Sequence, residues 1–545
     1  MLVNKVVTGV NGTTMRHIVL CMILHPQVNP YQVNDIQSQY SIQNNAMLKD
    51  TPVNGITYEN ADVSSDNYHH LEEDIKLLKE LGVDFYRFSI SWSRILPTGD
   101  IRNINQAGID HYNRLIDLLL EKDIKPFVTM FHWDYPQPLQ DLGGWTNPVM
   151  VDYFVEFAHL LLKTYGDRVK LWLTHNEPRL FSVGAYAKVS LNYPQLAPGI
   201  IMPGIAEYLS VHHILLSHAK VYHMYDKQFR PHQHGKMGIS LDTFFYRPQT
   251  PAEEEARDRL LQFHIGWIAN PIFGTGDYPE IVRRIVDENS KKEGRLTSRL
   301  PRFSDQEIRD LKGSADFFGI NHYTTYLRDT GVNLEADPKS KIAGPFWLIY
   351  EPEGFRELLN WLKKEYNNPP IFITENGCSQ TGKTLSEELN DDRRMDTFRY
   401  AYLEQLLKAV NIDKVNVTGY SGWSFMDSFE WDSGFNERFG FYHVDFKDPN
   451  GQGELKNQPV FTEKYYYQGF CNRNFKMVLI YDEGFCCGRC KRHWCFTAFH
   501  FSASIFHTIA QRKKLKQNWC NENNRSVDKN GVQIFPLILH TNDSF

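Results

Sequence analysis

The sequence predicts an α/β fold, because short apolar strands alternate with helices over most of the chain. Such alternation is typical of parallel β/α units. Seven strands are expected at 84–90, 126–131, 169–174, 237–241, 316–320, 371–374 and 417–423. A TIM (β/α)8 barrel requires eight strands, so the predicted barrel apparently lacks or replaces its first strand.

Helices fill the connections between these strands. They are expected near 68–81, 109–121, 148–165, 207–228, 355–366 and 393–410. The first is amphipathic and stops at Gly82, a residue type that commonly ends helices. Residues 1–57 offer no evident strand that could come before it.

Composition excludes several classes of protein. The chain has 545 residues with 42% hydrophobic and 23% charged side chains, so it can bury a large core. A net charge of −6 gives no footprint for nucleic acid. No apolar run approaches the roughly 20 residues of a membrane span. Residues 18–24 after Arg16 and His17 resemble a minimal signal sequence, but no small-residue cleavage site follows.

Two predicted strands end in a glutamate. Thr174-His175-Asn176-Glu177-Pro178 closes one, and Ile373-Thr374-Glu375-Asn376-Gly377 closes another. The carboxyl ends of barrel strands carry the active site, and a pair of carboxyl groups can cleave a glycosidic bond. The alternative is that each Glu only caps the helix that follows it.

Further motifs occur along the same alternating region. They are Tyr86-Arg87-Phe88-Ser89, Ser91 to Pro97, Phe131-His132-Trp133-Asp134-Tyr135-Pro136-Gln137, Gly143-Gly144-Trp145, Gly319-Ile320-Asn321-His322-Tyr323 and Trp423 to Trp431. Together with the two glutamate motifs, this order resembles glycoside hydrolase family 1, the β-glucosidase and myrosinase group, in its animal or insect form. The resemblance covers residues 58–468. It implies a retaining β-glycosidase that hydrolyses β-glucosides, O-linked or thio-linked, through a covalent glycosyl-enzyme.

The resemblance assigns catalytic roles. Glu375 matches the nucleophile and Glu177 the acid/base. Arg87 is expected beside Glu375, where its charge would favour the ionised carboxylate, and repulsion between the carboxylates would favour a protonated Glu177. Asn176 matches the residue that bonds the sugar 2-hydroxyl, and Tyr323 matches the tyrosine that holds the nucleophile.

Six further residues match the sugar site of the family. The sugar itself would contact His132, Trp133, Trp423, Glu430 and Trp431. Trp347 matches an aromatic side chain on the aglycone side. The resemblance implies no cofactor or metal, and a small glycoside is the expected partner. Oligomeric state is not predicted. An extracellular location is favoured by the resemblance, whereas the lack of a clear signal sequence leaves a cytoplasmic one open.

Three alternatives compete with this interpretation. A catalytically impaired sugar-binding relative would fit the absent first strand, although both glutamates are present. Residues 377–384 fit the P-loop pattern for nucleotide binding, but the acidic residues that follow would repel phosphate. The tail residues Cys487, Cys490, Cys495, His493 and His500 imitate zinc spacing without a second half-site.

The two ends of the chain depart from the family. Residues 1–57 are expected to be poorly ordered or outside the family, and they lack the Gln-(Ile/Val)-Glu-Gly motif that supplies a sugar-binding Gln. The barrel is expected over 58–470, followed by a Cys-rich tail, 471–545, that is expected to be disordered and outside the family. Because of the first-strand question, the activity of this chain is itself an open prediction.

Overall fold

The computed structural model describes five main stretches of the chain. These are residues 64–187, 196–248, 253–327, 347–379 and 400–444, together with residues 61 and 446 and the backbones of six short strands. The chain divides into two units, Met1–Asp482 and Glu483–Phe545. All of the described residues belong to the first unit.

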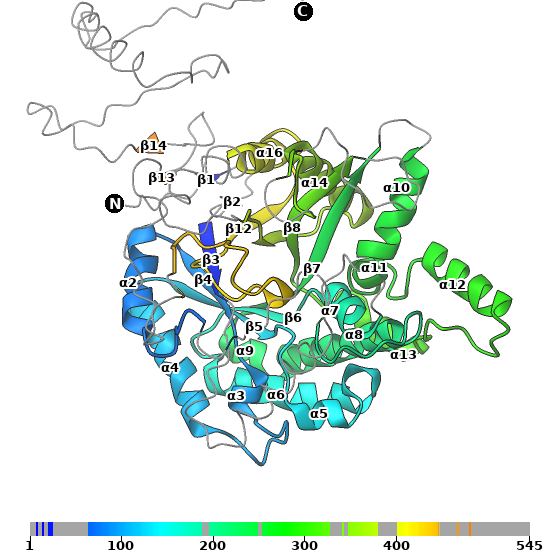
Figure 1. Ribbon diagram of the computed structural model, residues 1–545, viewed down its shortest axis with the longest axis horizontal. Helices are drawn as coiled ribbons and strands as arrows, with labels where there is room; N and C mark the ends of the chain where they lie inside the picture. The colour runs from blue at the N-terminus through cyan, green and yellow to red at the C-terminus, as the bar shows by residue number, and fades with distance from the viewer. Residues whose placement is uncertain are drawn as a thin grey trace, which may run out of the picture. The chain divides into compact units, whose positions relative to one another are not determined.

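Eight parallel strands close into a barrel (Figure 1). In spatial order after β11 (Ile371–Glu375) come β12 (Val417–Trp423), β3 (Leu20–Leu24), β4 (Phe85–Ser89), β5 (Lys125–Phe131), β6 (Leu171–Asn176), β7 (Lys236–Arg247) and β8 (Phe317–Leu327). The predicted TIM barrel is therefore confirmed, and each of the seven expected strands is present.

The first position in the barrel is filled by β3. Its backbone pairs in parallel with β12 on one side, where Tyr420 is opposite Leu20, and with β4 on the other, where Phe85 is opposite Cys21. The expectation that residues 1–57 contain no strand candidate is therefore wrong. Of the two predicted variants, a barrel lacking its first strand or one replacing it, the strand pairing supports replacement. This strand falls within the segment that resembles a signal sequence.

Helices surround the barrel in the expected alternation (Figure 1). Their bounds are α2 Leu71–Leu81, α3 Trp92–Ile95, α4 Gln106–Glu121, α5 Gln137–Asp141, α6 Val149–Tyr165, α7 Pro178–Tyr186, α8 Ala206–Met224, α9 Arg230–Gln233, α10 Glu254–Leu261, α11 Trp267–Phe273, α12 Glu280–Lys292, α13 Asp305–Leu311, α14 Pro352–Glu365 and α16 Tyr400–Asn411. Short 3-10 segments are η2 Gly144–Thr146 and η7 Trp431–Ser433, and π segments are η3 Tyr225–Phe229 and η5 Gln262–Gly266. Gly82 ends α2 in the left-handed conformation, at φ 69°.

Additional short strands lie outside the barrel. They form three antiparallel pairs: β1 (Val7–Thr8) with β2 (Thr14–Met15), β9 (Lys341–Ile342) with β10 (Ile349–Tyr350), and β13 (Tyr466–Tyr467) with β14 (Leu479–Ile480). The last pair falls near the boundary of the predicted barrel and tail, and the remaining tail lies outside the described residues.

An aromatic layer fills the interior of the barrel. Phe85, Phe127, Leu173, Phe317 and Phe372 form one buried cluster, contributed by five different strands. The rings of Phe85, Phe127, and Phe372 lie 4.9–5.9 Å apart. Barrel interiors are filled by such layers of side chains from several strands, so this end of the barrel is packed and not a pore.

A polar layer lies directly above the aromatic one. Arg87, Thr129 and Thr374 each follow an interior phenylalanine by two positions on β4, β5 and β11. Since side chains on a strand alternate between faces, these polar residues also face the interior. The layer lies toward the carboxyl ends of the strands, where the two glutamates are found.

One buried carboxyl outside this layer gives a prediction about stability. Asp74 on α2 is buried, and the side-chain amide of Asn67 donates to it at 2.5 Å. Burial raises its pKa from 3.8 to about 8, against the effect of Asn67 and assisted by the charges of Glu73 and Asp66. The unfolded chain therefore loses this proton at a lower pH than the folded chain does.

Asp74→Asn is expected to stabilise the protein at pH 8 but not at pH 4. The stability that the protonated carboxyl contributes is present below its unfolded pKa and is lost as pH rises toward 8. An amide does not ionise, so the variant should gain at least about 1 kcal/mol at pH 8. Urea unfolding at both pH values measures the gain. Glu80→Gln, on the exposed face of the same helix, is the control, and an equal gain at both pH values would refute the mechanism.

Candidate active site

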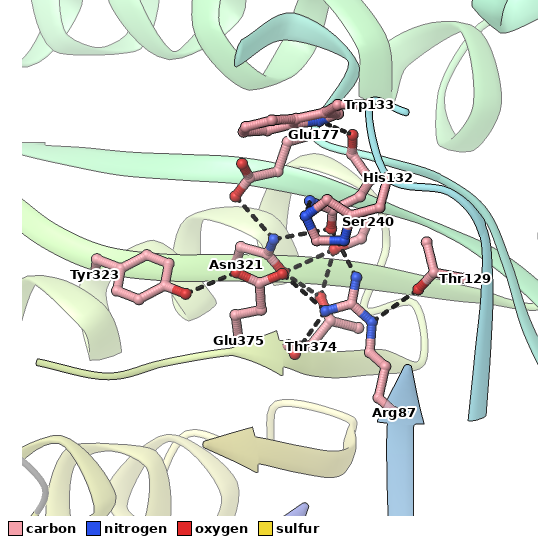
Figure 2. Close-up of polar contacts among 11 residues, drawn as sticks. Arg87, Thr129, His132, Trp133, Glu177, Ser240, Asn321, Tyr323, Thr374 and Glu375 are labelled. Atoms are coloured by element: carbon pink, nitrogen blue, oxygen red, sulfur yellow. Dashed lines mark hydrogen bonds and ion pairs between the residues drawn. The ribbon is translucent and has the colours of Figure 1, made fainter. Parts of the chain in front are cut away.

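Glu375 is held at the end of β11 by two donors. Arg87 donates from Nη1 to Oε1 at 2.8 Å, and the Tyr323 hydroxyl donates to Oε2 at 2.7 Å (Figure 2). Arg87 is itself fully buried, and its Nε donates to Thr129 Oγ1 at 3.0 Å. Both oxygens of the carboxylate are therefore oriented, and its charge has a partner in the barrel interior.

A chain of hydrogen bonds leads from Glu375 to Glu177. Arg87 donates from Nη2 to Asn176 Oδ1 at 2.7 Å. Asn321 donates from Nδ2 to the same oxygen at 3.1 Å and to Glu177 Oε1 at 2.8 Å. The two carboxyl groups are thus joined through three side chains that come from β4, β6 and β8.

The orientation of the Asn321 amide is fixed by hydroxyl groups. Ser240 and Thr374 both donate to its Oδ1, at 2.8 and 2.7 Å, and these two hydroxyls are 2.5 Å apart (Figure 2). With its oxygen occupied by donors, the amide must point its nitrogen at Glu177 and Asn176. Asn321 therefore acts as an oriented donor inside the site.

Glu177 lies in a left-handed turn between β6 and α7. Its φ and ψ are 46° and 58°, and its backbone N–H donates to the Ser240 carbonyl at 2.8 Å. Its side chain accepts no hydrogen bond from the first turn of α7. The alternative that Glu177 only caps a helix is therefore not supported by its contacts.

Burial has the largest effect on both carboxyl groups. The pKa of Glu177 is raised well above its usual value by burial, with added repulsion from Glu375 and Asp242. Burial also raises the pKa of Glu375, but the Arg87 charge and the Tyr323 hydrogen bond oppose the effect. Glu177 is therefore the better placed of the two to keep a proton, as the sequence predicts, although burial and not repulsion is the leading cause.

His132 and three tryptophans gather beside the glutamates. Asn176 and His132 are joined between Nδ2 and Nε2 at 3.1 Å, and Trp133 donates from Nε1 to the Asn176 carbonyl at 2.8 Å. The ring of His132 lies 6.3 Å from Trp423 and 6.2 Å from Trp431. Trp133 and Trp431 are 4.4 Å apart. These aromatic faces come from the ends of β5 and β12 and from η7.

Trp347 and Glu430 both lie near Tyr323. The Trp347 ring meets the Tyr323 ring edge to face at 6.0 Å. Glu430 precedes η7, and its charge contributes to a raised pKa of Tyr323, for which burial is the main cause and Glu375 the next. All eleven residues predicted from the sequence therefore lie within one connected neighbourhood.

Two polar residues in this neighbourhood are absent from the predicted set. Asn321 occurs inside a predicted motif but without a role, and Asp242 lies in the middle of β7, opposite Asn321 on β8. Both are polar residues in or after an apolar strand, which is the signal that could have singled them out. Their roles depend on neighbouring strands, which the linear sequence does not give.

The alternative ligand sites lie partly or wholly outside the described residues. Gln380–Thr384 of the P-loop pattern, and every residue of the zinc-like cluster, lie outside the described residues. Within the part of the chain that is described, no group of three or more His, Cys, Asp or Glu is arranged to hold a metal. The helices described there are all too short or too polar to cross a membrane.

A parallel barrel with buried, hydrogen-bonded carboxyl groups at its carboxyl end defines a class of barrel proteins equipped for acid–base and nucleophilic chemistry. Comparison with known proteins narrows this class. The sequence pattern of "Glycosyl hydrolase family 1" matches residues 41–475. The chain belongs to this family, which confirms the resemblance seen in the sequence.

Individual relatives agree with this assignment. The chain is 44% identical over 423 residues to human lactase/phlorizin hydrolase, covering 74% of this chain and 21% of the relative, so it spans about a fifth of that protein. It is 42% identical over 410 residues to myrosinase 1 of Brevicoryne brassicae, covering 72% and 85%. The solved structure of an aphid myrosinase superposes with a TM-score of 0.71 at 38% identity, covering 79% and 94%.

Proposed function

We propose that this protein is a retaining β-glycosidase with Glu375 as nucleophile and Glu177 as acid/base. The observation that carries the proposal is the hydrogen-bonded chain Glu375–Arg87–Asn176–Asn321–Glu177. Glu375 accepts from the Arg87 cation and the Tyr323 phenol, whereas Glu177 accepts from the neutral amide of Asn321. Unequal environments of this kind assign different protonation states to two carboxyl groups.

In the first step, Glu375 attacks the anomeric carbon while Glu177 donates its proton to the departing oxygen. The C–O bond to the aglycone breaks and a bond from the sugar to Glu375 forms. Arg87 and Tyr323 orient the carboxylate of Glu375 for attack. Glu177 supplies the proton, which its raised pKa allows it to hold until this step. The leaving group departs as a neutral alcohol, phenol or thiol.

In the second step, the ionised Glu177 takes a proton from water. The water oxygen bonds to the anomeric carbon and the bond to Glu375 breaks, which restores both carboxyl groups and retains the anomeric configuration. A retaining enzyme needs its carboxyl groups only about 5 Å apart. In support, Asn321 donates to Glu177 and is also among the groups that lower the pKa of Glu375, so one side chain reaches both.

The sugar would bind against the aromatic cluster of His132, Trp133, Trp423 and Trp431, with Glu430 and Asn176 as hydrogen-bonding partners. Aromatic faces suit the apolar face of a pyranose, and a carboxylate can accept from two hydroxyls. β-Glucosides are the proposed substrates. The name of the aphid relative, a myrosinase, supports including thioglucosides among the substrates to be tested.

A covalent trap tests this proposal. Incubation with a dinitrophenyl 2-deoxy-2-fluoro-β-glucoside should release one equivalent of dinitrophenol and leave a stable adduct. Peptide mass spectrometry is expected to place the adduct on Glu375. Proton NMR of the first sugar product of an ordinary aryl β-glucoside should show the β-anomer. An α-anomer, or an adduct on another residue, would refute the retaining mechanism.

A second candidate is a sugar-binding relative with impaired turnover. It is favoured by the sequence of β3, Leu-Cys-Met-Ile-Leu, which contains no counterpart of the sugar-binding Gln implied by the family motif. In that case glucose or an iminosugar would bind in a calorimeter, whereas the fluoroglucoside would leave no adduct. Both measurements on one preparation separate the two candidates.

A further inference from the structure

Helix α7 begins immediately after Glu177 and is therefore mechanically linked to it. Glu177 occupies the N-cap position and Pro178 the first turn, but the Glu177 side chain does not accept from the helix. The first backbone N–H groups of a helix have no partner within it and need an acceptor. If Glu177 supplied that acceptor, its carboxyl group would be turned away from the reacting bond.

Asp242 supplies the acceptor from the neighbouring strand. Its Oδ1 accepts the backbone N–H of Leu180 at 3.3 Å, while its Oδ2 accepts from Arg179 Nε at 2.9 Å. The Nη2 of Arg179 lies 2.8 Å from the same oxygen, and His264 Nε2 lies 2.9 Å from it. Asp242 is thus fixed by Arg179 and Leu180 in the first turn of α7 and by His264 in η5.

The charges in this cluster follow from its contacts. Burial alone would raise the pKa of Asp242, but Arg179 and His264 outweigh it and hold the pKa below its usual value. Asp242 is therefore a carboxylate, which can only accept hydrogen bonds. Burial and the Arg179 charge lower the pKa of His264 to about 4, so the imidazole is neutral and donates from Nε2.

We propose that Asp242 is a positioning residue for the acid/base, capping α7 in place of Glu177 so that the Glu177 carboxyl group remains free to face the glycosidic oxygen. This inference rests on the proposed function and deepens it. Arg179 and His264 hold the cap, and the Asp242 carboxylate adds a negative charge that acts on Glu177.

The charged groups around Glu177 decide the expected pH effect. They are Glu375 on β11, Asp242 on β7 and Arg87 on β4, while the neutral Asn321 donates from β8. The charges of Glu375 and Asp242 raise the pKa of Glu177, and that of Arg87 lowers it. Neutralising Asp242 removes a repulsion and leaves the Arg179 cation without its anionic partner. Both changes lower the pKa of Glu177, so it ionises at a lower pH.

Asp242→Asn is therefore expected to act on protonation of the leaving group alone. The alkaline limb of kcat/KM should move to lower pH by roughly one unit. At pH 7, hydrolysis of an alkyl β-glucoside should fall on the order of 10-fold or more. A dinitrophenyl β-glucoside needs no proton for departure, and trapping by its fluoro analogue should keep its wild-type rate.

Asp316→Asn is a matched control. Asp316 also accepts from an arginine, a second side chain and a backbone N–H: Arg230 at 2.7 Å, the Tyr222 hydroxyl at 3.1 Å and Met237 N at 2.7 Å. It lies at the amino end of β8, at the opposite end of the barrel from Glu177. Its variant should lose stability to a comparable degree without a change in pH limb or leaving-group dependence.

The outcomes separate this inference from the proposed function. If the wild-type chain hydrolyses neither glucoside, the proposed function fails. If the wild type is active and Asp242→Asn slows both substrates equally with an unmoved alkaline limb, the positioning role is overturned. Should Asp242→Asn not fold, His264→Phe removes one donor but keeps both charges, and a smaller loss confined to the alkyl glucoside is expected. Equal losses on both substrates would again overturn the role.

Discussion

Glu375→Gln is expected to reduce turnover of aryl β-glucosides by on the order of 10⁴-fold or more. The amide keeps the volume of the side chain and can still accept from Tyr323, but it carries no charge to attack the anomeric carbon. Arg87 would lose its anionic partner in a fully buried position. The variant should also leave no adduct with the fluoroglucoside, which steady-state kinetics and mass spectrometry together would measure.

A buried carboxyl group elsewhere provides the control for this variant. Glu207 is buried at the start of α8 and accepts from the backbone N–H groups of Gly204 and Ile205. Glu207→Gln should leave kcat/KM within a few fold of wild type, since it contacts no proposed catalytic group. If Glu375→Gln retained normal turnover while folded, the nucleophile would have to be another residue.

Glu177→Gln is expected to have an effect that depends on the leaving group. Without the proton, hydrolysis of alkyl β-glucosides should fall by about 10²–10⁴-fold. Dinitrophenyl glucosides should still form the glycosyl-enzyme rapidly, because their leaving group departs as a stable anion. The second step then lacks its base, so a burst of dinitrophenol followed by slow turnover is expected in stopped-flow measurements.

Azide distinguishes this mechanism from general damage to the site. A small anion needs no base, so it should attack the accumulated intermediate and speed the slow phase, yielding a β-glucosyl azide. Wild-type protein should not respond, because its own deglycosylation is assisted by Glu177. Absence of both the burst and the azide effect would show that Glu177 is not the acid/base.

Most of the barrel could be predicted from the sequence. The barrel strands β4 to β8, β11 and β12 combine apolar runs with intervening helices, and this local pattern reflects burial on both faces. Strand β3 could not be recognised, because a five-residue apolar run followed by no helical periodicity is equally compatible with a signal sequence. Its assignment depends on parallel pairing with β4 and β12, which are distant in sequence.

The site was partly predictable for the same reason. The two glutamates, His132, Trp133 and Trp423 stand at strand ends, so a barrel gathers them at one edge. The Asn321 and Asp242 contacts cross from strand to strand and from strand to helix, and they depend on register. Glu177 in particular lies in a left-handed turn, at φ 46°, which cannot be predicted from its residue type.

The aromatic layer beneath Arg87 closes the amino-terminal side of the proposed active site. Phe85, Phe127, Leu173, Phe317 and Phe372 block passage through the far end of the barrel. Among the described residues this layer fills the amino-terminal end of the barrel, so the departing aglycone and the water that hydrolyses the glycosyl-enzyme are both expected to pass through the carboxyl-terminal end. An alcohol present at that end would compete with water for the sugar, so the protein is expected to synthesise new β-glycosides in alcohol-rich media. The relative amounts of alcohol and water that reach the glycosyl-enzyme would then set how much glycoside is made and how much is hydrolysed.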